Sequence, residues 1–143
     1  MASIQTLVGA SLLFMTTASA HFSMLEPVPL GGKNADTKKE GNWPCGDPVP
    51  SFSTNATNDF HVDGDLISLA NLHSEGTWLI RGKVSDNSDS NWTQLFPTIY
   101  QEGIGSFCEP AITVPREWVG KTGLVGVAAK GADDFLYQVI MLS

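Results

Sequence analysis

The stretch LVGVAAKGADDFLYQVIML, residues 124–142, sets the fold class of this chain. It joins two apolar runs, 124–129 and 135–142, across a short segment with a glycine and two adjacent aspartates. Runs of this length, rich in Val, Ile, Leu and aromatic residues and bounded by Gly and Asp, are typical of β-strands joined by a turn. We expect an antiparallel hairpin here, with Asp133 and Asp134 at its solvated tip and no catalytic role for either.

Further runs with strand character follow residue 60, at 66–69, 77–84, 96–100 and 111–114. Turn residues separate them, one helical turn is expected at 115–119, and no amphipathic helix of a dozen residues is present. The segment 21–60 holds most of the prolines, so we expect extended pieces and turns there. Short strands at this spacing predict an all-β fold, an antiparallel β-sandwich.

The first twenty residues join an apolar run, 7–15, to the small residues Ala18, Ser19 and Ala20. This is the pattern of a secretory signal peptide, and the run is shorter than the about 20 residues that span a bilayer. We predict a signal peptide over 1–20 and one exported domain over 21–143. No spacer and hydrophobic tail of an anchor signal follow the last strand, so we expect a secreted protein, with cell-surface association as the alternative.

The charge of the chain restricts its partners. Fifteen acidic residues oppose eight basic ones, which gives a formal net charge of −7. Such a charge disfavours nucleic acid and anionic membranes as partners and favours a cation. We expect a monomer that binds a metal ion.

Two cysteines and two glycosylation sequons agree with export. An even pair without C-x-x-C spacing, Cys45 and Cys108, predicts one disulfide in an oxidising compartment. The alternative, two thiolate metal ligands, lacks a neighbouring set of zinc ligands. The sequons at Asn55 and Asn91 lie in polar stretches and predict N-glycosylated surface loops.

Cleavage after Ala20 would make His21 the first residue of the mature chain. Its α-amine and its Nδ1 could then chelate one metal ion, and a second imidazole would complete a T-shaped set of three nitrogens. Nitrogen ligands in a tetragonal arrangement suit Cu(II). The alternative is that a surface histidine stands at this position by chance.

Two other histidines could supply the second imidazole. His73 lies in a turn between two predicted strands, where a ligand would be exposed to its partner residue. His61 follows an aromatic residue at the start of a strand, a place typical of a packed or solvated side chain. We favour His73, with an ordinary surface turn residue as the alternative. The chain has no G-x-S-x-G elbow, P-loop, H-E-x-x-H pair or dinucleotide fingerprint.

Several short motifs occur in a fixed order along the predicted mature chain. They are His21-Phe22-Ser23 with Pro27, Pro44-Cys45-Gly46, His73, Gly105-Ser106-Phe107-Cys108-Glu109-Pro110 and Leu136-Tyr137-Gln138. In this order and spacing the chain resembles the fungal copper-acquisition proteins related to lytic polysaccharide monooxygenases, the X325 or BIM1-like family. The resemblance covers essentially the whole mature chain.

The resemblance implies a small immunoglobulin-like or fibronectin-like β-sandwich with a histidine brace. In this brace His21 supplies its amine and imidazole, and His73 supplies the second imidazole. It implies copper capture and delivery rather than oxidation of polysaccharide. Members of the family often carry a glycolipid anchor and act alongside a membrane copper transporter, so a transporter or the cell wall is the expected partner.

The chain departs from the family near its end. The family motif continues with Cys-Ala-Asp, and its aspartate, taken as the third protein ligand, falls on Met141, while its cysteine falls on Val139. A thioether at Met141 would favour Cu(I), but methionine in a terminal apolar strand is more often part of the core, and we favour packing. Asp133 or Asp134 could supply an oxygen ligand instead, although neither aligns with the family motif.

We therefore expect a secreted, non-catalytic copper-binding protein. One alternative is a copper-dependent monooxygenase, which needs a flat face with aromatic residues around the metal. The other is a secreted interaction protein that binds no metal.

Overall fold

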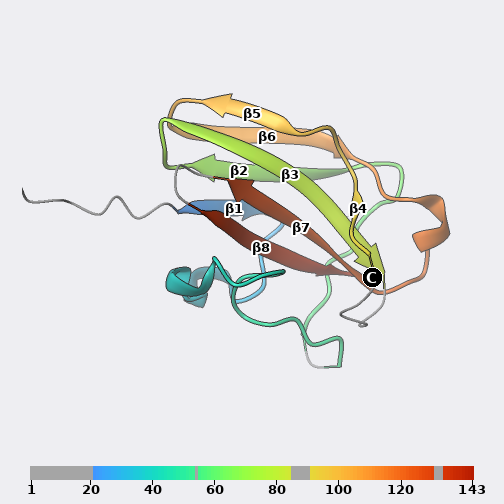
Figure 1. The fold of residues 1–143 in the computed structure, drawn as a ribbon. Coiled ribbons are helices and arrows are strands. Elements are labelled where there is room, and N and C mark those ends of the chain that lie inside the picture. The colour runs from blue at the N-terminus through green and yellow to red at the C-terminus, as the bar shows by residue number, and fades with distance from the viewer. Residues whose placement is uncertain (1–20, 54, 85–90, 131–133) are drawn as a thin grey trace, which may run out of the picture.

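Two antiparallel β-sheets pack face to face in this protein (Figure 1). The computed structural model describes residues 21–53, 55–84, 91–130 and 134–143, so the predicted signal peptide, residues 1–20, lies outside the described residues. Within the described part of the chain, no helix is long and apolar enough to cross a membrane. The predicted all-β antiparallel sandwich is confirmed.

The smaller sheet has the order β1-β2-β6, and the larger has the order β4-β3-β7-β8 with β5 also paired to β3. The strands of the smaller sheet are β1 (Phe22–Glu26), β2 (Asp65–Asn71) and β6 (Gly105–Ile112). The strands of the larger sheet are β3 (Glu75–Val84), β4 (Thr93–Gln94), β5 (Ile99–Glu102), β7 (Gly123–Lys130) and β8 (Phe135–Leu142). Three 3-10 turns complete the described elements: η1 (Gly32–Asn34), η2 (Thr37–Lys39) and η3 (Arg116–Trp118).

The predicted hairpin forms as β7 and β8, in a register that pairs Gly123 with Leu142 and Lys130 with Phe135. The helical turn expected at 115–119 is η3. Two strand predictions need correction. Of the run 96–100, only the last two residues form a strand, as the start of β5, because Pro97 cannot donate to a ladder; β4 lies before the run. Of the strand expected at 111–114, residues 111–112 are the end of β6, which begins at Gly105 and is an edge strand that tolerates Pro110, and residues 113–114 follow it.

The main core lies between the sheets. Every second side chain of a strand faces this core. On β7 these include Val125 and Val127, and on β8 they include Ile140 and Leu142. Trp78 is the largest fully buried side chain of this core. The register of the hairpin therefore determines which half of its apolar residues faces the other sheet.

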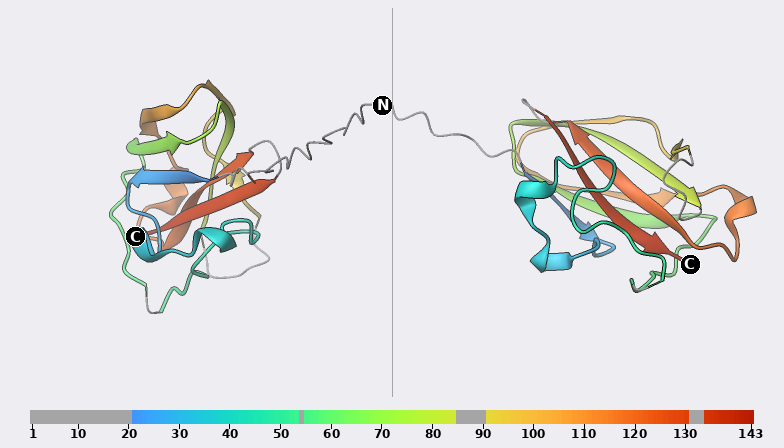
Figure 2. Two further views of the ribbon diagram at one scale, coloured as in Figure 1. Left: turned by 90° about the vertical axis from the view of Figure 1, so that its left-hand side faces the viewer. Right: turned by 60° about the horizontal axis from the view of Figure 1, so that its bottom comes forward.

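The other half of the hairpin's apolar residues faces a second core. The segment between β1 and β2 runs along β8 and covers the outer face of the larger sheet (Figure 2). Backbone bonds attach it there, from Leu30 N to Val139 O at 2.8 Å and from Tyr137 N to Glu40 O at 2.8 Å. Burial on both faces explains why these strands read as continuous apolar runs rather than alternating ones.

The predicted disulfide between Cys45 and Cys108 is not formed, and both thiols are unpaired. Cys45 is buried in the second core, and burial raises the pKa of its thiol despite the nearby positive charges of Arg81 and Lys83. Cys108 stands opposite Ser68 on the outer face of the smaller sheet and is exposed. Two residues on opposite outer faces of a sandwich are too far apart for a disulfide.

The two predicted glycosylation sites differ in their surroundings. Asn91 is exposed. Asn55 is half-buried, and its Oδ1 accepts a hydrogen bond of 2.6 Å from the N–H of Ser51. Asn91 is therefore the more accessible of the two acceptors.

Arg81 attaches the segment between β1 and β2 to the larger sheet. It is 4% exposed, and its guanidinium lies 4.4 Å from the ring of Trp43 and 4.2 Å from that of Trp92. One of its nitrogens donates a hydrogen bond of 2.7 Å to the carbonyl of Pro44. The side chain thus joins β3 to the segment through stacking and a charge-assisted bond.

We expect Arg81→Ala to lower the free energy of unfolding by about 2–3 kcal/mol, because a desolvated cation–π stack and a buried hydrogen bond are lost. Urea denaturation followed by tryptophan fluorescence measures this change. Arg116→Ala is the control, since Arg116 forms only an exposed ion pair with Asp63, for which we expect a loss of less than about 1 kcal/mol. Equal losses in the two variants would contradict a role of Arg81 as anchor.

Candidate metal site

Two of the predicted ligands meet at one end of the sandwich. His21 comes directly before β1, and His73 lies in the turn between β2 and β3, at the left in Figure 1. The antiparallel register of β1 and β2 pairs Phe22 with Asn71 and so carries the start of β1 to this turn. The main-chain N–H of His21 donates a hydrogen bond of 2.9 Å to Nε2 of His73. The lone pair of Nε2 therefore points at the nitrogen that cleavage after Ala20 would turn into the α-amine.

The two histidines border a small hollow with an apolar floor. The rings of Phe22 and Trp78 contact each other there, with centroids 5.4 Å apart. Glu75 also lines the hollow, and its Oε2 accepts a hydrogen bond of 2.9 Å from the hydroxyl of Tyr100, which raises the pKa of that phenol. Among the described residues, no three His, Cys, Asp or Glu side chains are grouped to hold a metal ion. A metal here would depend on the two histidines and the terminal amine.

Asn71 holds the turn that carries His73, and sequence analysis missed it. This side chain is 1% exposed, its Oδ1 accepts from the N–H of His73 at 3.2 Å, and its Nδ2 donates to the carbonyl of Gly103 at 3.0 Å. Gly103 in turn donates to the carbonyl of Ser74 at 2.6 Å. The sequence does hold one indication of this role. Asn71 continues the alternation of inward-facing residues on β2 that begins with Ile67 and Leu69, so a polar side chain stands at a position expected to be apolar.

The structure does not bring Met141 to the two histidines. Met141 is fully buried in the second core beside Cys45, and it pairs with Leu124, near the end of the hairpin away from Leu136, which lines the hollow. Met141 therefore packs in the core, as we favoured, and does not line the hollow that the two histidines border.

The remaining polar candidates also lie outside the hollow. His61 precedes β2, whereas His73 follows it, so the length of the strand separates the two imidazoles. Nδ1 of His61 contacts Oδ2 of Asp65 at 3.0 Å, and the ring is exposed. Asp134 is exposed and its Oδ1 accepts from the N–H of Phe135 at 2.7 Å, as in a turn, whereas Asp133 lies outside the described residues.

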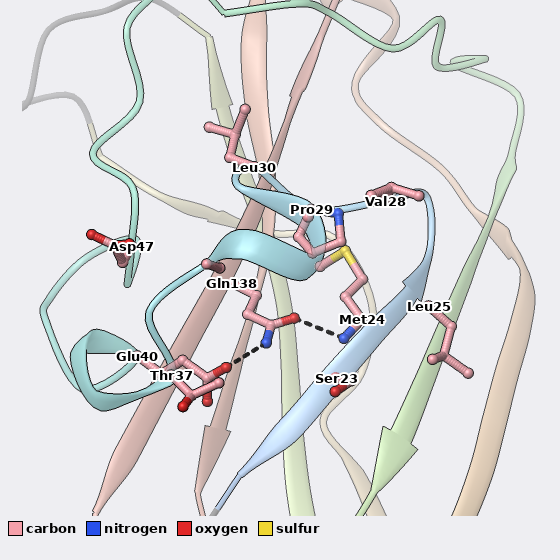
Figure 3. Close-up of a pocket in the computed structure, with 12 residues that line it drawn as sticks. Ser23, Met24, Leu25, Val28, Pro29, Leu30, Thr37, Glu40, Asp47 and Gln138 are labelled. Carbon is pink, nitrogen blue, oxygen red and sulfur yellow. Dashed lines mark hydrogen bonds between the residues drawn. The ribbon is translucent and has the colours of Figure 1, made fainter.

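A buried acid, Glu40, lies beneath β1 and was also missed (Figure 3). It is 3% exposed, and its Oε1 accepts a hydrogen bond of 2.8 Å from Nε2 of Gln138. The same Nε2 donates to the carbonyl of Phe22 at 3.1 Å, and Oε1 of Gln138 accepts from the N–H of Met24 at 2.7 Å. Gln138 thus links Glu40 to the strand that begins beside His21.

Burial raises the pKa of Glu40 above its ordinary 4.5, while the hydrogen bond from Gln138 and the charge of His21 oppose the rise. Its Oε2 is buried without a hydrogen-bond partner in the described structure. Nothing in the sequence marks this glutamate, which stands in a polar stretch that reads as a solvated turn.

The raised pKa predicts a pH-dependent effect of Glu40→Gln on stability. Some acids have a higher pKa in the folded state than in the unfolded state. Such an acid stabilises the fold fully at pH values below its unfolded-state pKa, and this contribution is lost as the pH rises through its folded-state pKa. We therefore expect the variant to be more stable than wild type at about pH 7.5, with a difference that disappears below pH 4.5. Urea denaturation across this range tests it, with the exposed Glu26→Gln as control. A difference that is constant with pH would contradict the prediction.

One comparison with known proteins identifies a family. The family model for the copper acquisition factor BIM1-like domain matches residues 19–142. A comparison with curated protein sequences returns no match. The family match covers all of the described strands and both histidines that meet at the hollow. The chain therefore belongs to the family of BIM1-like copper acquisition factors.

Proposed function

We propose that this protein is exported, loses residues 1–20, and binds one copper ion through the α-amine and Nδ1 of His21 and Nε2 of His73. The observation that carries the proposal is the 2.9 Å contact between the His21 nitrogen and Nε2 of His73. Family membership supports copper as the metal. The same donor set could otherwise serve another ion that accepts nitrogen ligands.

The distance between these two atoms suits neighbouring ligands of one metal. Nitrogen ligands lie about 2 Å from such an ion, so two that subtend a right angle are about 2.8 Å apart. In a T-shaped set the amine is at a right angle to both imidazoles. The apolar floor of the hollow, with Phe22 and Trp78, would limit the access of water from below.

Maturation would control the activity of the site. Before cleavage the His21 nitrogen belongs to a peptide bond and cannot act as an amine ligand. After cleavage it is an α-amine that must lose its proton to bind, so copper affinity should fall as the pH falls. Secretion and metal binding would thus be coupled in one processing step.

We assign copper to the protein as cargo rather than as a catalytic cofactor. The family is described by copper acquisition, and the net charge of −7 favours attraction of cations. Delivery to a membrane copper transporter or retention at the cell wall would then be the physiological step. Polysaccharide oxidation by the copper-loaded protein with a reductant would overturn this assignment.

Copper titration followed by EPR tests the site. Protein that begins at His21 should bind one Cu(II) tightly with a signal from nitrogen ligands. One extra alanine before His21 should weaken binding by about 100-fold or more, because the amine and the imidazole no longer act as one linked pair. His73→Ala should also lose tight binding, while His61→Ala, the matched control, should keep it. Equal binding by the His21-initiated and extended forms would refute the proposal.

Asn71→Ala should weaken Cu(II) binding by about 10–100-fold, because His73 loses the bond that holds its turn. Isothermal titration measures the affinity, and circular dichroism checks that the sandwich is intact. Asn91→Ala, a change of the same side chain at an exposed position, is the control. Unchanged affinity in a folded Asn71→Ala variant would show that the turn keeps His73 in place without this bond.

A further inference from the structure

Glu40 occupies an unfavourable position for an acid. A buried carboxyl group costs free energy unless it is neutral, fully hydrogen-bonded or paired with a positive charge. One oxygen of Glu40 has its bond from Gln138, and the other has none in the described structure. An apolar residue would avoid this cost, and the wall around it, with Met24 and Leu30, is otherwise largely apolar.

The hydrogen-bond partner of Glu40 leads toward the candidate metal site. Gln138 donates to Oε1 of Glu40 and to the carbonyl of Phe22, and so connects the carboxylate to the residue that follows His21. The mature amine would add positive charge at His21. Figure 3 shows Glu40, Gln138 and Met24 along the wall of a cavity of about 420 Å³ between β1 and the η1–η2 segment.

We propose that Glu40 is the buried counter-charge of the copper site and makes this site prefer Cu(II) to Cu(I). This inference rests on the proposed function. A Coulomb interaction grows with the charge of the ion, so a fixed carboxylate stabilises Cu(II) about twice as strongly as Cu(I). Burial makes the interaction effective, because salt and water screen a buried charge much less than an exposed one. Glu40 is a positioning and tuning residue and not a ligand.

Glu75 does not fill this role, although it is closer to His73 in the chain and also lines the hollow. Glu75 is exposed, so salt screens its charge, and its carboxylate accepts a bond from Tyr100. Glu40 combines a buried charge with a hydrogen-bonded link to β1. Bound copper would offset the free-energy cost of burying this carboxylate.

Glu40→Gln tests the inference, since it removes the charge and keeps an oxygen that can accept from Gln138. We expect the Cu(II) affinity of the mature protein to fall about tenfold and the Cu(I) affinity about threefold. The resulting change of about threefold in the Cu(II)/Cu(I) preference raises the reduction potential by about 30 mV. Competition titrations with chromophoric chelators for each oxidation state and voltammetry provide the two readouts.

Two further variants complete the experiment. Glu26→Gln removes an exposed charge from the same strand, β1, and should leave both affinities and the potential unchanged. Glu40→Asp keeps the charge and should hold the Cu(II)/Cu(I) preference within about twofold of wild type, which separates charge from packing.

The outcomes are distinct. If wild type binds copper and Glu40→Gln leaves the potential unmoved, or lowers both affinities equally, the counter-charge is refuted while the proposed function stands. If wild type with a free His21 terminus binds no copper, the proposed function fails and this inference fails with it.

Discussion

The pairing of β1 with β2 is the constraint on which the candidate site depends. Phe22 stands opposite Asn71, so the residue before the strand and the turn after its partner come together at one end of the sandwich. A shift of one residue would exchange the two faces of β1 and remove Phe22 and Met24 from the core. The same apolar contacts that set the register therefore set the separation of the His21 and His73 nitrogens.

The β7–β8 hairpin imposes the second constraint, because both of its faces are apolar. One face packs on the smaller sheet, and the other must be covered by the segment between β1 and β2. Met141 belongs to that covered face, so its position follows from packing alone. Covering the face also places Glu40 under β1. The packing of this segment, and not the polar stretch around Glu40, buries its carboxyl group.

The sequence predicted the features that depend on local patterns. The apolar runs and the turns between them located the hairpin, the long strand β3 and the class of fold, and the expected processing point identified His21. The disulfide, Asn71 and Glu40 depend on tertiary contacts. Cys45 and Cys108 lie on opposite outer faces, which spacing alone does not reveal, and a glutamate in a polar stretch gives no sign that it will be buried.

The carboxamide of Gln138 has a consequence for self-association. It donates to the carbonyl of Phe22 and accepts from the N–H of Met24, and so occupies two main-chain groups on β1 as a neighbouring peptide unit would. The strand β1 is an edge of its sheet, and exposed edges pair readily with strands of other molecules. One side chain thus makes this edge a poor template for a strand of a second copy.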